Sequence, residues 1–186
     1  MKNELRNEEV AIIVALEDEL PKELIPGFNV FYSGVGKINA TFKSSEIINK
    51  FNPKLIINYG TAGSLKEDLS GLYEVSDFIQ RDMDVSELGF KIGETPLDPI
   101  NKISFGRSGL SCGTGDNFVI SKPKILSDLV DMESYAIAKV CKKTNIDFIC
   151  YKFVSDNADI NASENWKNNV SLGKNLFKEK LLDLFN

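Results

Sequence analysis

The sequence contains no histidine, and it has only three cysteines. Without histidine the chain cannot form a Ser-His-Asp or Cys-His catalytic group, or the common histidine metal sites. The cysteines, Cys112, Cys141 and Cys150, form no CxxC pair and are odd in number, which argues against a disulfide scaffold and against a zinc site. If the protein is an enzyme, its proton transfers must therefore fall mainly to carboxylates.

The sequence also lacks an excess of positive charge and any long apolar run. The formal net charge is −5 and the lysines are scattered among acids, whereas a nucleic-acid-binding protein needs a cationic surface. No apolar run approaches the ~20 residues that a membrane-spanning helix requires. The charged residues 1–9 do not resemble a signal peptide. We therefore expect a cytoplasmic protein that binds neither nucleic acid nor a membrane.

Three continuous apolar runs predict β-strands that are buried on both faces: VAIIVAL (residues 10–16), LIINY (55–59) and FICYKFV (148–154). Residues 38–51 carry apolar side chains at helical spacing, and the alanine-rich residues 134–143 end in a basic turn, as helices prefer. Residues 73–80 are a shorter strand candidate. The alternation of strand and helix candidates along the chain predicts a single α/β domain over residues 1–186, with a mainly parallel sheet.

The C-terminal segment from residue 163 predicts one amphipathic helix. Trp166, Val170, Phe177 and Leu181 recur on one side of it.

Ligands of such sheets usually bind beyond the carboxyl ends of the strands, which selects four segments. These are Glu17-Asp18-Glu19, SGVGK (residues 33–37), GTAGS (60–64) and VSDNAD (154–159). Each segment also has a purely structural interpretation. In the same order, these are an acidic first turn of a helix, a tight strand-to-helix turn, a turn made of small residues, and an N-cap or turn. A fifth segment, VDME (130–133), can be a helix start beside a core methionine. SGVGK lacks the spacing of a P-loop or a dinucleotide fold, and no segment decides a function alone.

Together and in this order, the segments resemble the methylthioadenosine/S-adenosylhomocysteine nucleosidases of the nucleoside phosphorylase and nucleosidase superfamily. The resembling pieces are VAIIVALEDEL (residues 10–20), SGVGKINA (33–40), NYGTAGSL (58–65), DMDVSELGF (82–90), GDNFV (115–119), VDMESYAIAKVC (130–141) and VSDNAD (154–159). The chain is a shortened member, abbreviated at residues 20–31 and 99–112. The resemblance implies a nucleoside phosphorylase-like, three-layer α/β/α fold around a mixed, mainly parallel sheet, and a homodimer.

The resemblance also implies a role for each matching residue. Glu19 matches the carboxylate that activates water, and Asp156 matches the acid that protonates the purine, positioned by Ser155. Glu133 matches the glutamate that binds the ribose hydroxyls. The other implied substrate-binding residues are Met132 under the sugar, Phe118 stacked on the base, Val119 contacting the base through its backbone, Val35, Ala62 and Gly63 lining the pocket, and Leu16 and Leu88 at the 5′ substituent.

The chemistry of N-glycosidic cleavage fits these residue types. The reaction builds oxocarbenium character on the ribose and negative charge on the departing base, so it needs an acid near N7 and a carboxylate that aligns water. Asp156 can deliver a proton near pH 7 only if burial raises its pKa or the bound base holds its proton. The scheme requires no metal and no cofactor; its only required partner is a small-molecule nucleoside.

Three functions remain open from the sequence. The first is release of adenine from methylthioadenosine or S-adenosylhomocysteine by water. The second is a related nucleosidase with another 5′ group or base, such as futalosine or deoxyadenosine, and the third is a catalytically weak nucleoside-binding protein. Glu19, Glu133 and Asp156 together argue against the third. A phosphorylase is disfavoured because ALEDEL and NYGTAG stand where the similar phosphorylases usually carry phosphate-binding arginines.

Overall fold

The computed structural model describes residues 5–98, 100, 102–106 and 109–185. The strands are β1 (Val10–Val14), β2 (Asn29–Tyr32), β3 (Leu55–Ser64), β4 (Gly71–Gln80), β5 (Lys102–Ser104), β6 (Leu110–Thr114), β7 (Leu129–Asp131) and β8 (Asp147–Asp156). The helices are α1 (Lys37–Phe51), α2 (Ser134–Thr144), α3 (Ala162–Asn169) and α4 (Lys174–Phe185), with short 3-10 turns η2 (Asn7–Glu9), η3 (Lys22–Leu24) and η4 (Ser86–Leu88).

The strands form one mixed sheet in the order β2-β1-β3-β7-β6-β4-β5, and β8 pairs with both β3 and β4. Parallel pairs join β1 to β2 and β3, β3 to β8, and β6 to β4 and β7. The pairs β3–β7, β4–β5 and β4–β8 are antiparallel. The mixed, mainly parallel sheet is therefore confirmed. The three predicted apolar runs form the adjacent parallel strands β1, β3 and β8, so their carboxyl ends meet at one edge.

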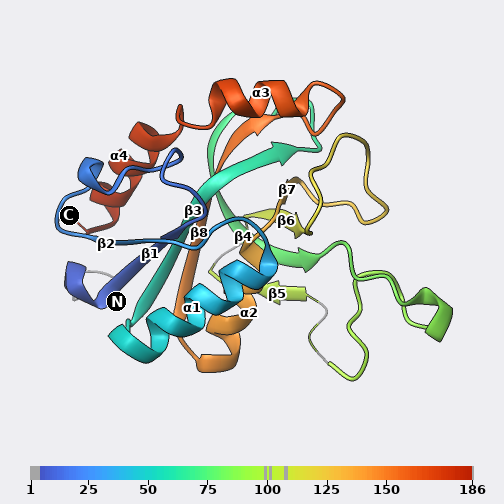
Figure 1. Ribbon diagram of the computed structural model, residues 1–186, viewed down its shortest axis with the longest axis horizontal. Coiled ribbons are helices and arrows are strands. Elements are labelled where there is room, and N and C mark those ends of the chain that lie inside the picture. Colours follow the sequence, from blue (N-terminus) through green and yellow to red (C-terminus); the bar gives the residue numbers. More distant parts are fainter. Residues whose placement is uncertain (1–4, 99, 101, 107–108, 186) are drawn as a thin grey trace.

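Helices cover both faces of this sheet, as Figure 1 shows. On one side, Ile13 and Ile56 pack with residues of α1 and α2 in one buried apolar cluster. On the other side, Ile12 and Ile57 pack in a second cluster with Phe177 of α4. Because neighbouring residues of a strand point to opposite faces, the runs must be apolar at every position. The three-layer α/β/α architecture is confirmed.

Helix α1 is where its periodicity predicts it, but part of its apolar side is not covered. Ala40 and Ile47 are buried against the sheet. Ile38 and Phe42 are 81% and 71% exposed. This chain alone therefore leaves large apolar side chains on the outer side of α1.

The C-terminal segment is two helices, so the prediction of one continuous helix was wrong. The chain bends between α3 and α4, and at Gly173 it passes very close to the sheet. A Cβ atom there would lie 2.3 Å from the Cγ atom of Phe153 and 2.6 Å from the hydroxyl of Tyr59, so the bend requires glycine. Phe177 is buried as expected, whereas Trp166 faces a cavity beyond the sheet.

Two of the candidate segments do not adopt the turn or helix start that was their structural alternative. GTAGS does not turn the chain, because β3 continues through it to Ser64 with a register shift against β8 between Ala62 and Gly63. Glu17, Asp18 and Glu19 form a turn after β1 and not the start of a helix. Both segments therefore stand at the edge where β1, β3 and β8 end. Within the described residues, no helix is long and apolar enough to cross a membrane.

Candidate active site

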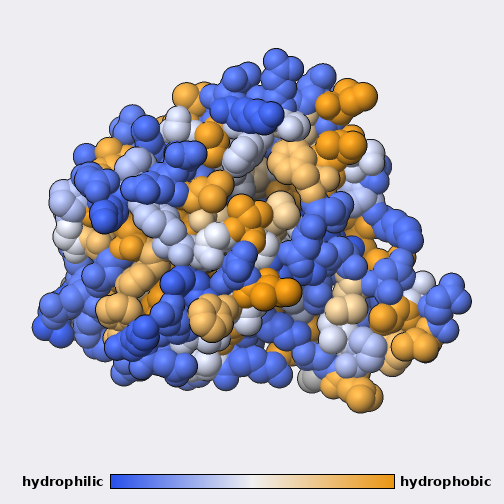
Figure 2. Space-filling model, in the orientation of Figure 1, coloured by the Kyte–Doolittle hydropathy of each residue, from blue (hydrophilic) through white to orange (hydrophobic). Residues whose placement is uncertain are grey.

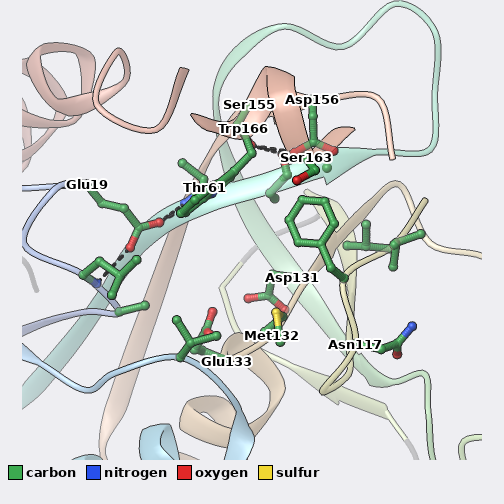
Figure 3. Close-up of a pocket in the computed structure, with 18 of the residues that line it drawn as sticks. Glu19, Thr61, Asn117, Asp131, Met132, Glu133, Ser155, Asp156, Ser163 and Trp166 are labelled. Atoms are coloured by element: carbon green, nitrogen blue, oxygen red, sulfur yellow. Dashed lines mark hydrogen bonds between the residues drawn. The ribbon is translucent and has the colours of Figure 1, made fainter. Parts of the chain in front are cut away.

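A cavity of about 270 Å³ lies beyond the carboxyl ends of β1, β3 and β8 and beneath α3. Figure 3 shows its side chains converging from these strands and from the start of α2, and Figure 2 shows the face on which it opens. The cavity is lined by these residues that the sequence analysis assigned to the site: Leu16, Glu19, Val35, Ala62, Gly63, Phe118, Val119, Met132, Glu133, Ser155 and Asp156. Beside them lie Ala15, Thr61, Arg81, Asn117, Val130, Asp131, Ser163, Trp166 and Lys167.

Leu88 is the predicted site residue that the structure places elsewhere. It is 71% exposed in η4 and does not line the cavity. After β4 the chain leaves the sheet and forms an extended loop, which projects from the body of the molecule in Figure 1. Leu88 therefore does not line the cavity of its own chain, and its role at the 5′ substituent stays a prediction.

Glu19 is the one buried carboxylate of the acidic turn; it is 4% exposed, while Glu17 and Asp18 point into solvent. Its Oε1 atom accepts hydrogen bonds from the backbone N–H of Thr61 at 2.7 Å and from the Thr61 hydroxyl at 2.8 Å. Its Oε2 atom accepts a longer bond, 3.2 Å, from the N–H of Leu16. The carboxylate is therefore held firmly by one oxygen at the cavity wall (Figure 3).

Asp156 ends β8 and is buried. Its Oδ1 atom accepts the backbone N–H of Ala158 at 2.9 Å, and its Oδ2 atom accepts the hydroxyl of Ser155 at 2.8 Å. Burial raises the pKa of Asp156 above its ordinary value, although these two hydrogen bonds oppose the rise. The side chain therefore keeps a proton to a higher pH than a solvent-exposed aspartate does.

Glu133 is the N-cap residue of α2 and is also buried. Its Oε1 atom accepts the N–H of Gly36 at 2.9 Å, which joins α2 to the SGVGK segment. Gly36 has a φ of 97°, a conformation that favours glycine. Burial, and then the negative charge of Asp131, raise the pKa of Glu133 to about 7, while Lys152 opposes them. Near neutral pH this carboxyl group is therefore present in both protonation states.

A buried ion pair behind the cavity was not predicted. Lys152 Nζ lies 2.9 Å from Asp131 Oδ2, and both side chains are 1% exposed. Asp131 also accepts the Thr114 hydroxyl at 2.6 Å and the Ser134 N–H at 2.8 Å, so the pair carries the hydrogen bonds that buried charges need. Burial lowers the pKa of Lys152, but Asp131 outweighs it and the net shift is upward. The sequence feature that could have predicted the pair is the lysine inside the apolar run FICYKFV, because a buried charge without a partner is costly.

Arg81 also lies at the cavity wall, but four hydrogen bonds hold it to the neighbouring backbone and to Asn117. It donates to the carbonyl groups of Gly113 at 3.1 Å and Gly115 at 3.2 Å. It also donates to Asn117, to the side-chain oxygen at 2.8 Å and to the carbonyl at 2.6 Å. Arg81 therefore supports the loop that precedes Phe118. Across the described ranges, no group of three or more acidic or cysteine side chains is arranged to hold a metal ion.

Comparison with known proteins gives a consistent result. The family model of the phosphorylase superfamily matches residues 28–112 and 113–185. The 5′-methylthioadenosine/S-adenosylhomocysteine nucleosidase of Staphylococcus haemolyticus is 35% identical over 153 residues, and the match covers 68% of this chain and 67% of that protein. The nucleosidase of the same name from Staphylococcus aureus strain MRSA252 is 34% identical over 154 residues, with the same coverage.

Solved structures give the same fold at lower identity. The futalosine hydrolase of Helicobacter pylori superposes with a TM-score of 0.85 at 22% identity, covering 94% of this chain and 97% of that one. The 5′-methylthioadenosine/S-adenosylhomocysteine nucleosidase of the same organism, in complex with a small molecule, gives a TM-score of 0.83 at 22% identity and the same coverage. The chain therefore belongs to the phosphorylase superfamily and, within it, to the 5′-methylthioadenosine/S-adenosylhomocysteine nucleosidase family.

Proposed function

We propose that the protein hydrolyses the N-glycosidic bond of 5′-methylthioadenosine and S-adenosylhomocysteine and releases adenine. One observation carries the proposal: Glu19, Glu133 and Asp156, which are far apart in the sequence, line one cavity. The relatives that match this chain at 34–35% identity are named for these two substrates. The residue roles below are part of the proposal.

In the proposed mechanism, Glu133 accepts hydrogen bonds from the ribose hydroxyls, and the ring of Phe118 stacks on the base. Glu19 aligns a water molecule on the anomeric carbon with its less engaged Oε2 oxygen and takes up a proton from it. Asp156, whose pKa is raised, donates its proton to the purine as the bond to the sugar breaks. The paired use of two carboxyl groups resembles inverting glycoside hydrolysis.

Two of the three cationic side chains around the cavity are held in other interactions, which supports water over phosphate as the attacking group. Arg81 is committed to the loop before Phe118, and Lys152 is committed to Asp131. Lys167 lines the cavity from α3 and is exposed. A phosphate on the anomeric carbon would face the Glu19 carboxylate, and like charges in a site of low dielectric repel strongly.

The test is incubation of the purified protein with methylthioadenosine, with and without phosphate, while free adenine is measured. The proposal predicts equal adenine release in both buffers and a free sugar as the second product. Strict dependence on phosphate, or binding without turnover, would contradict it. Parallel assays with S-adenosylhomocysteine, futalosine and deoxyadenosine measure the substrate preference, and a kcat/KM highest for futalosine would replace the proposed substrate.

The raised pKa of Glu133 predicts proton release when a nucleoside binds. Ribose hydroxyls donate hydrogen bonds to the ionised carboxylate, so binding lowers a pKa that starts at about 7. Near pH 7 the wild type should therefore release a fraction of a proton on binding methylthiotubercidin, in which carbon replaces N7 of the purine. Calorimetry in buffers of different ionisation enthalpy measures this number. Glu133→Gln should remove the release, and equal proton numbers in both proteins would refute the assignment.

We also propose that the working form is a homodimer formed through α1. Ile38 and Phe42 are exposed on its outer side, and apolar side chains lie among polar ones over α1 in Figure 2. In such a dimer, we expect the η4 loop of one subunit to reach the cavity of the other, which would give Leu88 its role at the 5′ substituent. Large apolar side chains on one face indicate such an interface.

The dimer predicts a change of mass in one variant. Light scattering after gel filtration should give twice the chain mass of 20.7 kDa for the wild type and a single chain mass for Phe42→Glu. Leu182→Glu is the control, because Leu182 is exposed on α4, which covers the opposite face of the sheet. A monomeric wild type would exclude the dimer.

A further inference from the structure

Trp166 is connected to Glu19 by two consecutive hydrogen bonds. Its indole Nε1–H donates to the hydroxyl oxygen of Thr61 at 3.0 Å, and that hydroxyl donates to Glu19 Oε1 at 2.8 Å. All three residues line the same cavity, Trp166 from α3, Thr61 from β3 and Glu19 from the turn after β1 (Figure 3). The connection therefore spans three elements that are distant in the sequence.

The order of donors and acceptors in this connection is fixed by chemistry. An indole N–H can only donate, and a threonine hydroxyl has one proton to give. Because Trp166 donates to the oxygen of Thr61, the Thr61 proton is directed to the carboxylate of Glu19. Loss of the indole N–H would remove this restraint on the rotation of the hydroxyl.

Helix α3, which carries Trp166, is anchored to the rest of the protein at two points. Asn169, one turn further along α3, donates its side-chain N–H to the carbonyl of Ser155 at 2.8 Å. Ala162 at the start of α3 is completely buried. Helix α3 is thus fixed to the end of β8, next to Asp156, and it holds the indole over Thr61.

We propose that Trp166 is a positioning residue for the hydrolysis: through Thr61 it fixes one oxygen of Glu19, so that the other stays directed at the attacking water. The inference rests on the proposed function and assigns no contact between Trp166 and the reacting atoms. Oε1 of Glu19 receives two short bonds from Thr61, whereas Oε2 receives one longer bond from the Leu16 N–H. That difference leaves Oε2 as the oxygen with acceptor capacity for water.

The test uses Trp166→Phe, which keeps an aromatic ring but removes the N–H. Loss of one neutral hydrogen bond should lower kcat about 3- to 10-fold and change KM by less than about 2-fold. Thr61→Val should lower kcat further, and Thr61→Ser, which keeps the hydroxyl, should retain most of it. In the Thr61→Val background, Trp166→Phe should have no additional effect on kcat, because the connection is already broken.

An optical measurement tests the contact without relying on turnover. Trp166 is the only tryptophan of the chain, so the protein's indole emission reports its surroundings alone. Thr61→Val, which removes the hydrogen-bond acceptor, should shift that emission to shorter wavelength, and Thr61→Ser should leave it unchanged. Circular dichroism melting checks that each variant is folded.

The outcomes separate this inference from the proposed function. If the wild type releases adenine but Trp166→Phe keeps the wild-type kcat, or lowers it equally with and without Thr61, the positioning role is overturned. A rise in KM alone would show that Trp166 only contacts the substrate, and it would also overturn the role. If the wild type does not hydrolyse any of the nucleosides, the proposed function fails and this inference fails with it.

Discussion

Replacement of Asp156 by asparagine is expected to lower kcat for adenine release at least about 100-fold, because a general acid contributes roughly 10²- to 10⁴-fold to a rate. Asparagine preserves the size of the side chain and leaves an acceptor for the N–H of Ala158. It cannot transfer a proton to the leaving purine. The measurement is the steady-state rate of adenine formation from methylthioadenosine, and KM should change much less than kcat.

The pH dependence gives the same residue a second test. The pKa of Asp156 is raised by burial, so the protonated acid is lost as pH rises through that shifted value, and kcat should fall on the alkaline side. The Asp156→Asn variant should lack this decline. Asp147→Asn is the matched control, since Asp147 is exposed at the opposite end of β8 and should behave as the wild type. Near-normal turnover by Asp156→Asn would remove it from the mechanism.

Glu19→Gln is the second substitution with a large expected effect, again at least about 100-fold on kcat. The amide keeps the shape of the side chain but cannot take up a proton from water. Its NH₂ group also places a donor where the carboxylate has an acceptor, against Thr61 or against the water. Nucleoside binding, measured by calorimetry with methylthiotubercidin, should change much less than turnover.

The neighbouring acids of the same turn provide the control for Glu19. Glu17 and Asp18 are exposed, and only Glu19 turns into the cavity. Glu17→Gln should therefore keep the wild-type rate. If Glu17→Gln and Glu19→Gln lose the same amount of activity, the effect comes from the turn as a whole, and Glu19 is not the base.

Much of the fold was predictable because its central strands are buried on both faces. Val10–Val14 is buried at every position, which is the reason for the unbroken apolar run that marks β1. The helices α1 and α2 cover one face and show the expected periodicity and basic last turn. Ligands of such sheets usually bind beyond the carboxyl ends of the strands, and parallel strands end at one edge, so the segments that contain Glu19 and Asp156 could be selected from the sequence.

Other parts depend on contacts that periodicity does not record. Trp166 has the spacing of a core residue, but it lies on α3, before the bend at Gly173, and donates to Thr61 at the cavity. Lys152 occupies a buried strand position because Asp131, distant in sequence, neutralises it. Leu88 was placed by similarity alone, and in one chain its loop points away from the cavity. These features require the tertiary structure.

A crystal structure with methylthiotubercidin bound tests the central claim most directly. It should place one nucleoside in the cavity, with Glu133 on the ribose hydroxyls, Asp156 facing position 7 of the base and Glu19 facing the anomeric carbon across one water molecule. A nucleoside bound outside this cavity, or any of the three carboxyl groups out of reach of it, would contradict the account.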